Sequence, residues 1–543
     1  MAYRRYDAAD RLLIGYDPFD LPEDHLVRLV ELITEEVVNL DSKPVGPGQP
    51  RFDPRLPVKV LVYGYAIGLR SSRQLEKACR ETLPFLLLTR GDCPSYRTLC
   101  SARVKYEQLI EEVWIHLFST AEQMGIKRLG RIVVDSTKLR ADASDESVVV
   151  AHEMQTMLDH IQQILNEASE ADVREDAEGY AGETLTGKLI DGDQLRDIMR
   201  NVRKKISKMR AEKQAGGAPT TGSEAPMAVK NEAPSAAKDE PQRKFKISSR
   251  MRKRLNEVCL ALADAIKSGT KHLCTTDFDA KMMGEGRHKR IAMCHSYEVA
   301  ADNGLLVAFG TSDSANDNPR LFGLVERAAA HEPSGVQSVD ADSGYYSGRS
   351  VSTLSLADID VCIPTTSTAC DMRKGLDIGT TVAKGASKVN MTYVPDADHY
   401  VCPEGKILAF EQLRTDRGVD ARVYRAPSGC RRCSLASTCL TQKNADHRTL
   451  VVPIENELLT RLQDKFGDTE HCDRYHHRAE AVETVFGFVR ATLGFTRWSL
   501  RGSQRVAAES KLITVAYQVR KIHSAIVENK NKGIRIALPA SAT

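Results

Sequence analysis

Three acidic side chains in this sequence follow or flank buried elements, and together they could bind metal ions. The first, Asp135, comes directly after the apolar run Ile132, Val133 and Val134. Such a run predicts a short buried strand with Asp135 at its tip. A carboxylate in that position loses solvation energy unless it is hydrogen-bonded, paired with a cation or bound to a metal. Asp135 is therefore a candidate ligand.

A second acidic position lies in residues 338–347, which read SVDADSGYYS. A short strand is expected to run into a glycine-containing turn here and to present Asp340 and Asp342. Residues two apart on a strand share a face, so either carboxylate could be the ligand. We favour Asp342, because it lies at the end of the strand, where an ion can reach it.

The third acidic position lies on a predicted helix over residues 475–490. Apolar residues recur there at the spacing of one helix face: Val482, Val485, Phe486 and Val489. Glu483 lies beside this buried stripe, and Glu480 is an alternative ligand on the same helix. Arg490, seven residues after Glu483, projects from nearly the same angle of the helix.

Two aspartates and a glutamate beside a cation form the residue set of a two-metal phosphoryl-transfer site. Carboxylates bind hard ions such as Mg²⁺, and two such ions can hold the attacking and leaving oxygens of a phosphodiester. A cation on the glutamate helix can hold a DNA phosphate. The sequence therefore indicates metal-dependent chemistry on nucleic acid.

The same stretches resemble the DDE transposases of bacterial insertion sequences. Residues 133–144, VVDSTKLRADAS, are similar to the family's first-aspartate strand and its Thr-Lys pair, and residues 340–347, DADSGYYS, are similar to its second-aspartate turn. The family's Tyr-x2-Arg signature, catalytic glutamate and downstream cation resemble Tyr475, Arg478, Glu483 and Arg490. The order of these motifs, with RWSLRG following at 497–502, makes the resemblance specific.

The resemblance implies an RNase H-like catalytic domain, a mixed sheet flanked by helices. It implies DNA strand cleavage and strand transfer by a triad that binds two Mg²⁺ or Mn²⁺ ions, namely Asp135, Asp342 and Glu483. The implied partners are double-stranded DNA, as terminal inverted repeats and as target, and a second copy of the chain in a homodimer or larger assembly on DNA. The residues expected to contact DNA are Tyr475, Arg478, Arg490, Lys138, Arg97 and Arg103.

Two positions differ from the family pattern. Ser136 stands where glycine is usual, and Arg490 stands where lysine is usual. Ser136 is a small residue in place of a small residue. Arg490 keeps the positive charge, although arginine and lysine are not equivalent at a phosphate. Neither difference removes a carboxylate from the triad.

The N-terminal part of the chain predicts short helices joined by tight turns. Helices are expected over 58–69, 71–81 and 95–106, the last of them with Ser95 as its cap. Arg97 and Arg103 lie among several cations of this block. The block resembles the N-terminal domain of the same transposases, which implies binding of DNA ends. The residues alone equally fit a solvated bundle that only packs or dimerises.

Two insertions are expected in the catalytic domain. The first, residues 145–273, carries helices on both sides of an Ala-, Pro- and Gly-rich linker at 214–242. The second, residues 367–470, holds a Cys-x2-Cys pair, Cys430 and Cys433, which suits one Zn²⁺ ion. Cys402 and Cys439 would complete four thiolates. Unliganded or redox-active thiols remain the alternative.

Composition is that of a soluble protein of several domains. The 543 residues have a net charge of +3 and no apolar run of membrane-spanning length, so a cytoplasmic protein without a membrane partner is expected. The weak net charge means that DNA binding must come from local basic patches. The expected segments are 1–45 and 46–125 (helical), 126–144 and 274–366 (catalytic), 145–273 and 367–470 (insertions), 471–528 (glutamate helix and closing helix) and 529–543 (tail).

Two other functions fit the same residues. An RNase H-like nuclease would cut DNA without joining it, and the sequence does not separate that activity from transposition. A DNA-binding regulator would keep the scaffold without chemistry. The intact set of acidic residues favours an enzyme over the regulator.

Overall fold

The computed structural model describes residues 21–37, 52–177, 248–285, 290–314, 320–376, 391–416, 419–440, 445–454 and 456–533. The chain divides into two compact units, one formed by residues 1–139 and 295–543 and the other by residues 140–294. The flexible linker predicted at 214–242 lies outside the described residues, as do residues 178–213 before it. None of the described helices is long and apolar enough to cross a membrane.

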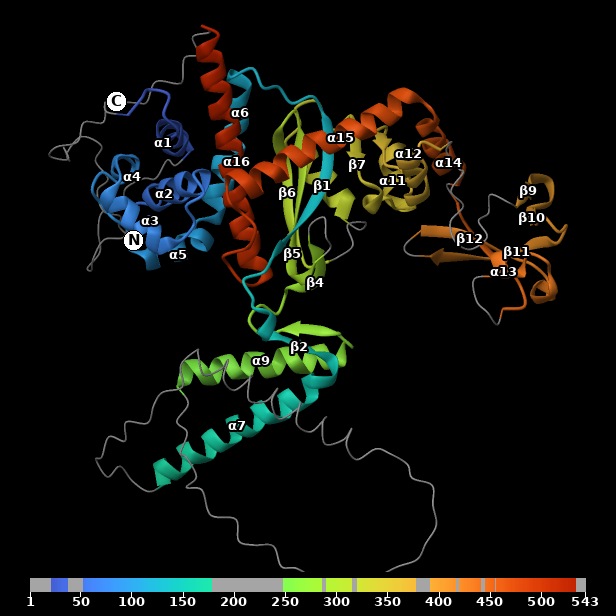
Figure 1. Ribbon diagram of the computed structural model, residues 1–543, viewed down its shortest axis with the longest axis horizontal. Helices are drawn as coiled ribbons and strands as arrows, with labels where there is room; N and C mark the ends of the chain where they lie inside the picture. Colours follow the sequence, from blue (N-terminus) through green and yellow to red (C-terminus); the bar gives the residue numbers. More distant parts are fainter. Residues whose placement is uncertain are drawn as a thin grey trace, which may run out of the picture. The chain divides into compact units, whose positions relative to one another are not determined.

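The larger unit is built on a mixed sheet in the order β6-β5-β1-β7-β8 (Figure 1). Its strands are β1 (Arg131–Arg140), β5 (Arg290–Asp302), β6 (Leu305–Ser312), β7 (Ser338–Ala341) and β8 (Asp360–Cys362). β1, β7 and β8 run parallel, whereas β5 and β6 form an antiparallel pair. Parallel strands need covering elements on both faces, and helices follow β6 and β7 in the chain. The predicted mixed α/β class is confirmed.

The Asn-Gly pair at residues 303 and 304 predicts a hairpin, and β5 and β6 form one there. Asn303 and Gly304 both adopt positive φ angles, 49° and 78°. A two-residue turn of this kind matches the twist of the flanking strands, and Asn-Gly is the pair that tolerates it best. The turn fixes the pairing of Asp302 with Leu305 and so sets the register of the whole hairpin.

Helices of the N-terminal segment and the long C-terminal helix share one core with the sheet. They are α1 (Leu26–Val37), α2 (Arg55–Ala66), α3 (Ser72–Glu81), α4 (Leu83–Thr89), α5 (Tyr96–Lys105), α6 (Glu107–Gln123) and α16 (Ser503–Asn531). The Ser95 side chain accepts a hydrogen bond from the backbone N–H of Thr98, as predicted for the cap of α5. α16 packs against α2, α6 and β6, so the chain's two ends stabilise each other (Figure 1).

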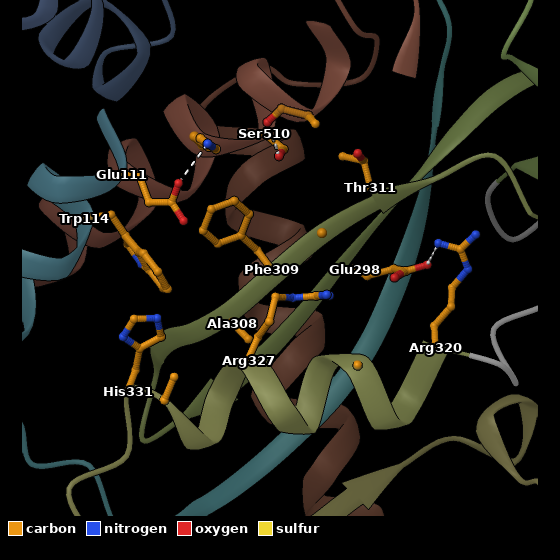
Figure 2. A pocket seen from close by; sticks show the side chains of 15 residues that line it. Glu111, Trp114, Glu298, Ala308, Phe309, Thr311, Arg320, Arg327, His331 and Ser510 are labelled. Atoms are coloured by element: carbon orange, nitrogen blue, oxygen red, sulfur yellow. Dashed lines mark hydrogen bonds and ion pairs between the residues drawn. The ribbon is translucent and has the colours of Figure 1, made fainter. Parts of the chain in front are cut away.

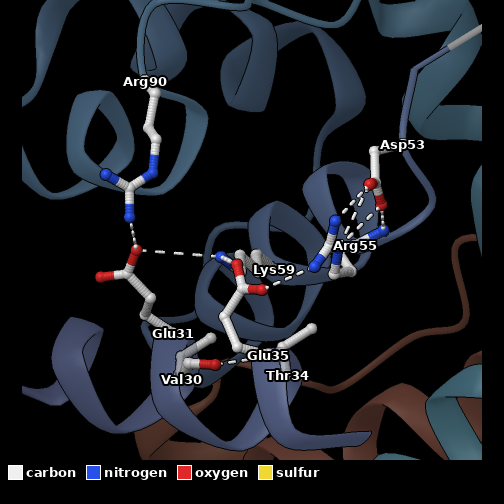
Figure 3. Close-up of polar contacts among 8 residues, drawn as sticks. All are labelled: Val30, Glu31, Thr34, Glu35, Asp53, Arg55, Lys59 and Arg90. Atoms are coloured by element: carbon white, nitrogen blue, oxygen red, sulfur yellow. Dashed lines mark hydrogen bonds and ion pairs between the residues drawn. The ribbon is translucent and has the colours of Figure 1, made fainter. Parts of the chain in front are cut away.

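A buried ion network joins α1 to α2 and α4 (Figure 3). The Lys59 side chain is fully buried, and its ammonium contacts the carboxylates of Glu31, at 3.8 Å, and Glu35. Arg90 lies 2.7 Å from Glu31, and Arg55 lies 2.9 Å from Glu35. The cations and carboxylates alternate, so each buried charge has an opposite charge beside it. Burial of charge is tolerated only under such pairing.

Removing the central cation of this network should destabilise the N-terminal helices. We expect Lys59→Ala to lower the free energy of unfolding by about 3 kcal/mol, because two carboxylates then lose their buried partner. The control is Lys77→Ala, at an exposed pair with Glu81 on α3, which should change stability by less than about 0.5 kcal/mol. Urea unfolding measures both. Equal effects of the two substitutions would show that the buried network is not stabilising.

A buried pair of acidic residues, Asp302 and Glu332, lies beside the start of β1. An Asp302 carboxylate oxygen accepts hydrogen bonds from the backbone N–H groups of Leu129 and of Gly130, the latter at 2.8 Å. Glu332 is buried beside it. Burial, and then the nearby charge of Asp302, raise the pKa of Glu332 from 4.5 to about 7. The folded protein therefore holds a proton at Glu332 under conditions where the unfolded chain has released it.

Stability should accordingly fall as pH rises through this window. Between pH 4.5 and about 7 the folded state binds more protons at Glu332 than the unfolded state, so the free energy of unfolding falls as pH rises. Above about pH 7 Glu332 is ionised in both states, and the free energy of unfolding falls no further on its account. We expect Glu332→Gln to be more stable than the parent at pH 8 by about 1–3 kcal/mol, and nearly equal at pH 5. Denaturant unfolding at the two pH values tests this. The exposed Glu326→Gln should show no such difference, and a pH-independent gain would refute the titration of Glu332.

The smaller unit is a helical pair with short strands. Its elements are β2 (Val148–Val150), α7 (Ala151–Ala177), α9 (Ser249–Lys267), β3 (His272–Cys274) and β4 (Lys281–Glu285). α7 and α9 pack through apolar residues such as Met157, Ile161 and Leu255. β4 pairs with the first half of β5. Both helices follow β1 in the chain.

A five-stranded antiparallel sheet surrounds the cysteines of the second insertion. Its strands are β9 (Thr392–Val394), β10 (His399–Val401), β11 (Ile407–Asp416), β12 (Val419–Arg425) and β13 (Thr449–Pro453), with a short helix α13 (Ala436–Cys439). This sheet is not predicted from the sequence. β11 shows why, because it exposes apolar residues such as Leu413 and lacks a regular alternation of buried and polar positions.

The remaining helices of the larger unit lie near the acidic residues in sequence. They are α10 (Leu321–Ala329), α11 (Gly348–Leu356), α12 (Thr366–Lys374), α14 (Asn456–Asp464), α15 (Thr469–Gly487) and the π-helical segment η9 (Phe488–Thr492). Short 3₁₀ turns are η2 (Asp145–Ser147), η4 (Ser343–Tyr345), η6 (Pro395–Ala397), η7 (Cys430–Arg432) and η8 (Lys465–Gly467). α15 contacts β7 and β8, which brings the predicted glutamate helix to the sheet.

Candidate active site

Asp135 lies in β1, and Asp342 directly follows the neighbouring parallel strand β7. β1 and β7 pair from Arg131 with Ser338 to Val134 with Ala341. The residue that follows this pairing is an aspartate in both segments. The prediction that Asp135 ends its strand is wrong, because β1 continues to Arg140. Only the pairing with β7 stops before Asp135, since β7 turns away at Asp342 into η4. The two carboxylates therefore lie where the parallel pairing of β1 with β7 ends.

A guanidinium lies between these two carboxylates. Arg478 on α15 is 3.8 Å from an Asp135 oxygen and 4.0 Å from an Asp342 oxygen. The Tyr475 hydroxyl donates a 3.0 Å hydrogen bond to Asp342. Each aspartate also accepts a 2.7 Å bond from the next backbone N–H, that of Ser136 or of Ser343. The space between the aspartates is therefore one that attracts positive charge.

Asp340, the alternative to Asp342, has a different environment. It is buried, and Arg474 binds its carboxylate through two nitrogens, with Nε at 2.9 Å from one oxygen and 3.1 Å from the other. Burial raises the pKa of Asp340, and the hydrogen bonds from Arg474 oppose that rise. Arg474 also pairs with Asp360 on β8. Asp340 thus belongs to an ion network that ties α15 to two strands.

Sequence reasoning did not identify Arg474. Its position directly before Tyr475 is visible in the sequence, but its partners Asp340 and Asp360 are more than one hundred residues away. Acidic residues on two successive strands, offset by two residues in the register, were the available signal. β7 and β8 pair Asp340 with Cys362 and Ser338 with Asp360.

Glu483 lies on α15 as predicted, and its side chain is exposed. No contact joins it to Asp135 or Asp342. Among the described residues, no three His, Cys, Asp or Glu side chains are grouped closely enough to hold a metal ion. The structure therefore brings the two aspartates together and leaves the glutamate apart from them.

Arg490 and Lys138 both belong to the surroundings of β1. Arg490, in the π-helical segment that follows α15, donates to the Thr137 hydroxyl at 2.6 Å and to the Lys138 carbonyl at 3.0 Å. The Lys138 ammonium donates to the hydroxyls of Ser136 and Ser296. π-Helical segments often occur at functional sites. Here the segment directs Arg490 toward the strand that carries Asp135.

The two N-terminal cations have opposite environments. Arg103 is buried, donates a 2.7 Å hydrogen bond to the Ser72 hydroxyl and lies over the Tyr65 ring. It therefore holds α5 to its neighbours. Arg97 is exposed beside the Tyr96 ring, and Arg73 lies over the same ring.

The four cysteines of the second insertion come together partly. Cys402, Cys430 and Cys439 share one small core. Backbone N–H groups donate to two of the sulfurs, from Lys406 to Cys402 at 3.3 Å and from Leu435 to Cys433 at 3.4 Å. Such bonds stabilise a thiolate and orient it. Burial raises the pKa of Cys439.

Two segments of the chain match known protein families. Residues 401–523 match a family described as Transposase DDE domain, and residues 17–105 match one described as Transposase domain (DUF772). Two segments of the chain therefore match transposase families, and one of these is a transposase DDE domain. The first match contains the cysteines, Tyr475, Arg478, Glu483 and Arg490, and the second contains α1 to α5. No curated protein matches the chain.

These matches support a transposase function in general, which is that of an enzyme that processes nucleic acid. The matched segments do not include β1 or β7. The evidence for the placement of Asp135 and Asp342 is therefore structural. It consists of the register of β1 with β7 and of the contacts that residues of α15 make with the two aspartates.

Proposed function

We propose that this transposase cuts DNA at the ends of an insertion sequence and joins the freed ends to target DNA, in a reaction that requires divalent metal ions. The observation that carries the proposal is the pairing of Asp135 and Asp342 around a cation, at the point where two parallel strands separate. Carboxylates so placed fit a hard divalent ion, because they supply oxygen ligands and a negative field.

The proposed ligands of two Mg²⁺ or Mn²⁺ ions are Asp135, Asp342 and Glu483. When bound, such ions supply an activated oxygen nucleophile and stabilise the leaving oxygen. Glu483, on the same helix as Arg478, would complete the set. Arg478 would then release the carboxylates and become available to a DNA phosphate, which attracts a guanidinium as a carboxylate does.

The proposed chemistry consists of two in-line displacements at phosphorus. In the first, a water oxygen bonds to a phosphorus at the element's end while the bond from that phosphorus to the 3′-oxygen breaks, and the water proton leaves. In the second, the freed 3′-hydroxyl attacks a phosphorus of target DNA, and a target 3′-oxygen departs. Protein residues bind and orient the DNA, and no covalent bond to protein is needed.

The proposed DNA contacts lie on separate elements. Tyr475 and Arg478 would bind phosphates near the cut bond, and Lys138 and Arg490 would bind close to β1. Arg97 is an exposed contact on α5, whereas Arg103 is buried and is left out of the proposal. Double-stranded DNA is the proposed partner, both as terminal repeats and as target. Because two ends must be joined, we propose a dimer or larger assembly on DNA.

The test is cutting and joining of a plasmid that carries the DNA flanking the gene. The expected result is Mg²⁺- or Mn²⁺-dependent cuts at both flanks, followed by joined products. Cuts without joining would indicate a nuclease, and sequence-specific binding without cuts would indicate a regulator. Either outcome would overturn the proposal.

We also propose a structural zinc ion at Cys402, Cys430, Cys433 and Cys439. The N–H donors to the sulfurs of Cys402 and Cys433 support this, because hydrogen bonds of this kind orient side chains that bind a metal. Zinc binding would draw the four sulfurs into a tetrahedron.

Metal analysis of purified protein tests the zinc site. We expect about one zinc ion per chain, and loss of most of it in Cys433→Ser. The control is Cys100→Ser, at an exposed thiol on α5, which should retain the metal. Zinc-free parent protein, purified without chelators, would contradict the proposal.

A further inference from the structure

A cavity of about 500 Å³ lies in the larger unit, apart from the acidic residues described above (Figure 2). Its walls come from β5, β6, α6, α10 and α16, which are all elements of the shared core. The residues that line the cavity do not include Asp135, Asp342 or Glu483. The volume is in the range of small-molecule sites. Because regular elements form its walls, the cavity is a preformed feature of the fold.

One end of the cavity is aromatic. The Trp114 ring lies 5.0 Å from the Phe309 ring and 4.8 Å from the His331 ring, between centroids. The Trp114 indole N–H donates to the Leu306 carbonyl at 3.1 Å, which fixes the ring. Burial lowers the pKa of His331, and the Arg128 charge adds to that effect, so its ring is neutral at neutral pH. This end suits a planar, uncharged ring.

Most charged side chains at the rest of the cavity are paired. Lys511 pairs with Glu111 at 2.8 Å, and Arg320 pairs with Glu298 at 3.2 Å and with Asp313 at 3.9 Å. Arg327, on the same face of α10 as Arg320, lines the cavity with no hydrogen bond or ion pair to any residue that the structure describes. Its guanidinium lies over Gly310, where an added Cβ would be only 3.0 Å from it. The Arg327 side chain is exposed, so its guanidinium is solvated in the unbound protein and available to an anionic ligand.

A second observation also points to a missing acceptor. The Nε of Arg320 is buried, and it has no hydrogen-bond acceptor within the described part of the chain. A buried donor without an acceptor is costly, so a ligand that supplies one is favoured. In Figure 2, Arg327 and Phe309 lie between the Trp114 and His331 rings on one side and the Arg320–Glu298 pair on the other.

We propose that this cavity binds a nucleotide. The base would pack against Trp114 and Phe309, and the phosphate would bind Arg327 with Arg320 beside it. A planar ring joined to a phosphate is the chemistry that satisfies both ends of the cavity, since guanidinium groups bind phosphate oxygens through paired donors. The nucleotide is either a free mononucleotide or one unit of a DNA strand. This inference does not depend on the proposed cleavage.

Binding to the intact chain tests the proposal. The chain has two tryptophans, Trp114 in the cavity and Trp498 in the buried core, so nucleotide binding should quench the fluorescence of Trp114. The probes are deoxyadenosine monophosphate, deoxyadenosine, inorganic phosphate and a short single-stranded oligonucleotide. We expect the monophosphate to bind at least about tenfold more tightly than deoxyadenosine or phosphate, because each supplies only half of the contacts.

The matched variants are Arg327→Gln, in the cavity, and Arg461→Gln, exposed on α14. Calorimetry should show affinity about tenfold weaker for Arg327→Gln, and unchanged for Arg461→Gln. Binding of the monophosphate would identify a free nucleotide, and binding of the oligonucleotide alone would identify a nucleotide within a strand. Both support the proposal if Arg327→Gln weakens them. Equal affinity of Arg327→Gln and the parent, no binding of either probe, or phosphate binding as tightly as the monophosphate would overturn it.

Discussion

Asp135→Asn and Asp342→Asn are expected to slow DNA cutting by about 10³-fold or more while leaving DNA binding nearly unchanged. Asparagine keeps the size of the side chain and a hydrogen-bond acceptor for the next backbone N–H, so the turn after each strand should persist. It removes the negative charge, which a hard divalent ion requires. The loss should therefore fall on the chemical step. Cutting rates and gel-shift affinities, measured on the same DNA, separate the two effects.

The glutamate of the proposed triad needs its own comparison. Glu483 and Glu480 lie on one helix, and neither contacts the aspartates. Glu483→Gln should match the aspartate variants, whereas Glu480→Gln should cut within about threefold of the parent, because a residue that binds no metal contributes little to the transition state. The reverse order would move the third ligand to Glu480. Joint loss of cutting and DNA binding in the aspartate variants would reject the assignment of Asp135 and Asp342.

Local sequence signals predicted several elements of this fold. The Asn303-Gly304 hairpin and the Ser95 cap depend on residues adjacent in the chain, and both form as expected. The turn after Asp342 is local too, since its side chain caps η4 through Ser343. Each of these features is determined by the conformational preference of one or two residues, which a sequence displays directly.

Other parts of the candidate site depend on pairing between distant segments. The register of β1 with β7 places Asp135 beside Asp342, and nothing near either residue specifies that register. Arg103 looked like a DNA contact because it is charged, but Ser72 and Tyr65 surround it in the folded chain. A charge in a sequence does not reveal its burial. Tertiary contacts decide it, and they were not visible before the fold.

Arg474 provides the strongest tertiary contact of the site, and its removal should have the second large effect. Arg474→Ala is expected to lower the cutting rate by about 10²-fold, because a small misplacement of reacting groups costs that much. The guanidinium joins Asp340 on β7 and Asp360 on β8 to the helix that carries Tyr475 and Arg478. Without it, α15 loses its fixed position against the strands, although its core face of Val482 and Val485 remains buried.

Lys465→Ala is the matched control, because Lys465 binds Asp360 at 3.1 Å but does not contact Asp340. It is partly exposed, so its loss should change cutting by less than about threefold. Arg474→Lys should recover only part of the activity, since an ammonium does not bind a carboxylate through two parallel donors.

The decisive readout for Arg474 is the pattern of effects rather than their size. If Arg474 positions α15, the turnover rate should fall more than the affinity for DNA, and Asp340→Asn should add little to Arg474→Ala, because both remove one network. If Arg474 only stabilises the fold, the cutting rate per folded molecule should equal that of the parent, and only the melting temperature should fall. The cutting rate and the melting temperature should be measured in the parent, Arg474→Ala, Asp340→Asn and the double variant. These measurements distinguish a residue that places Arg478 between two aspartates from one that only adds an ion pair.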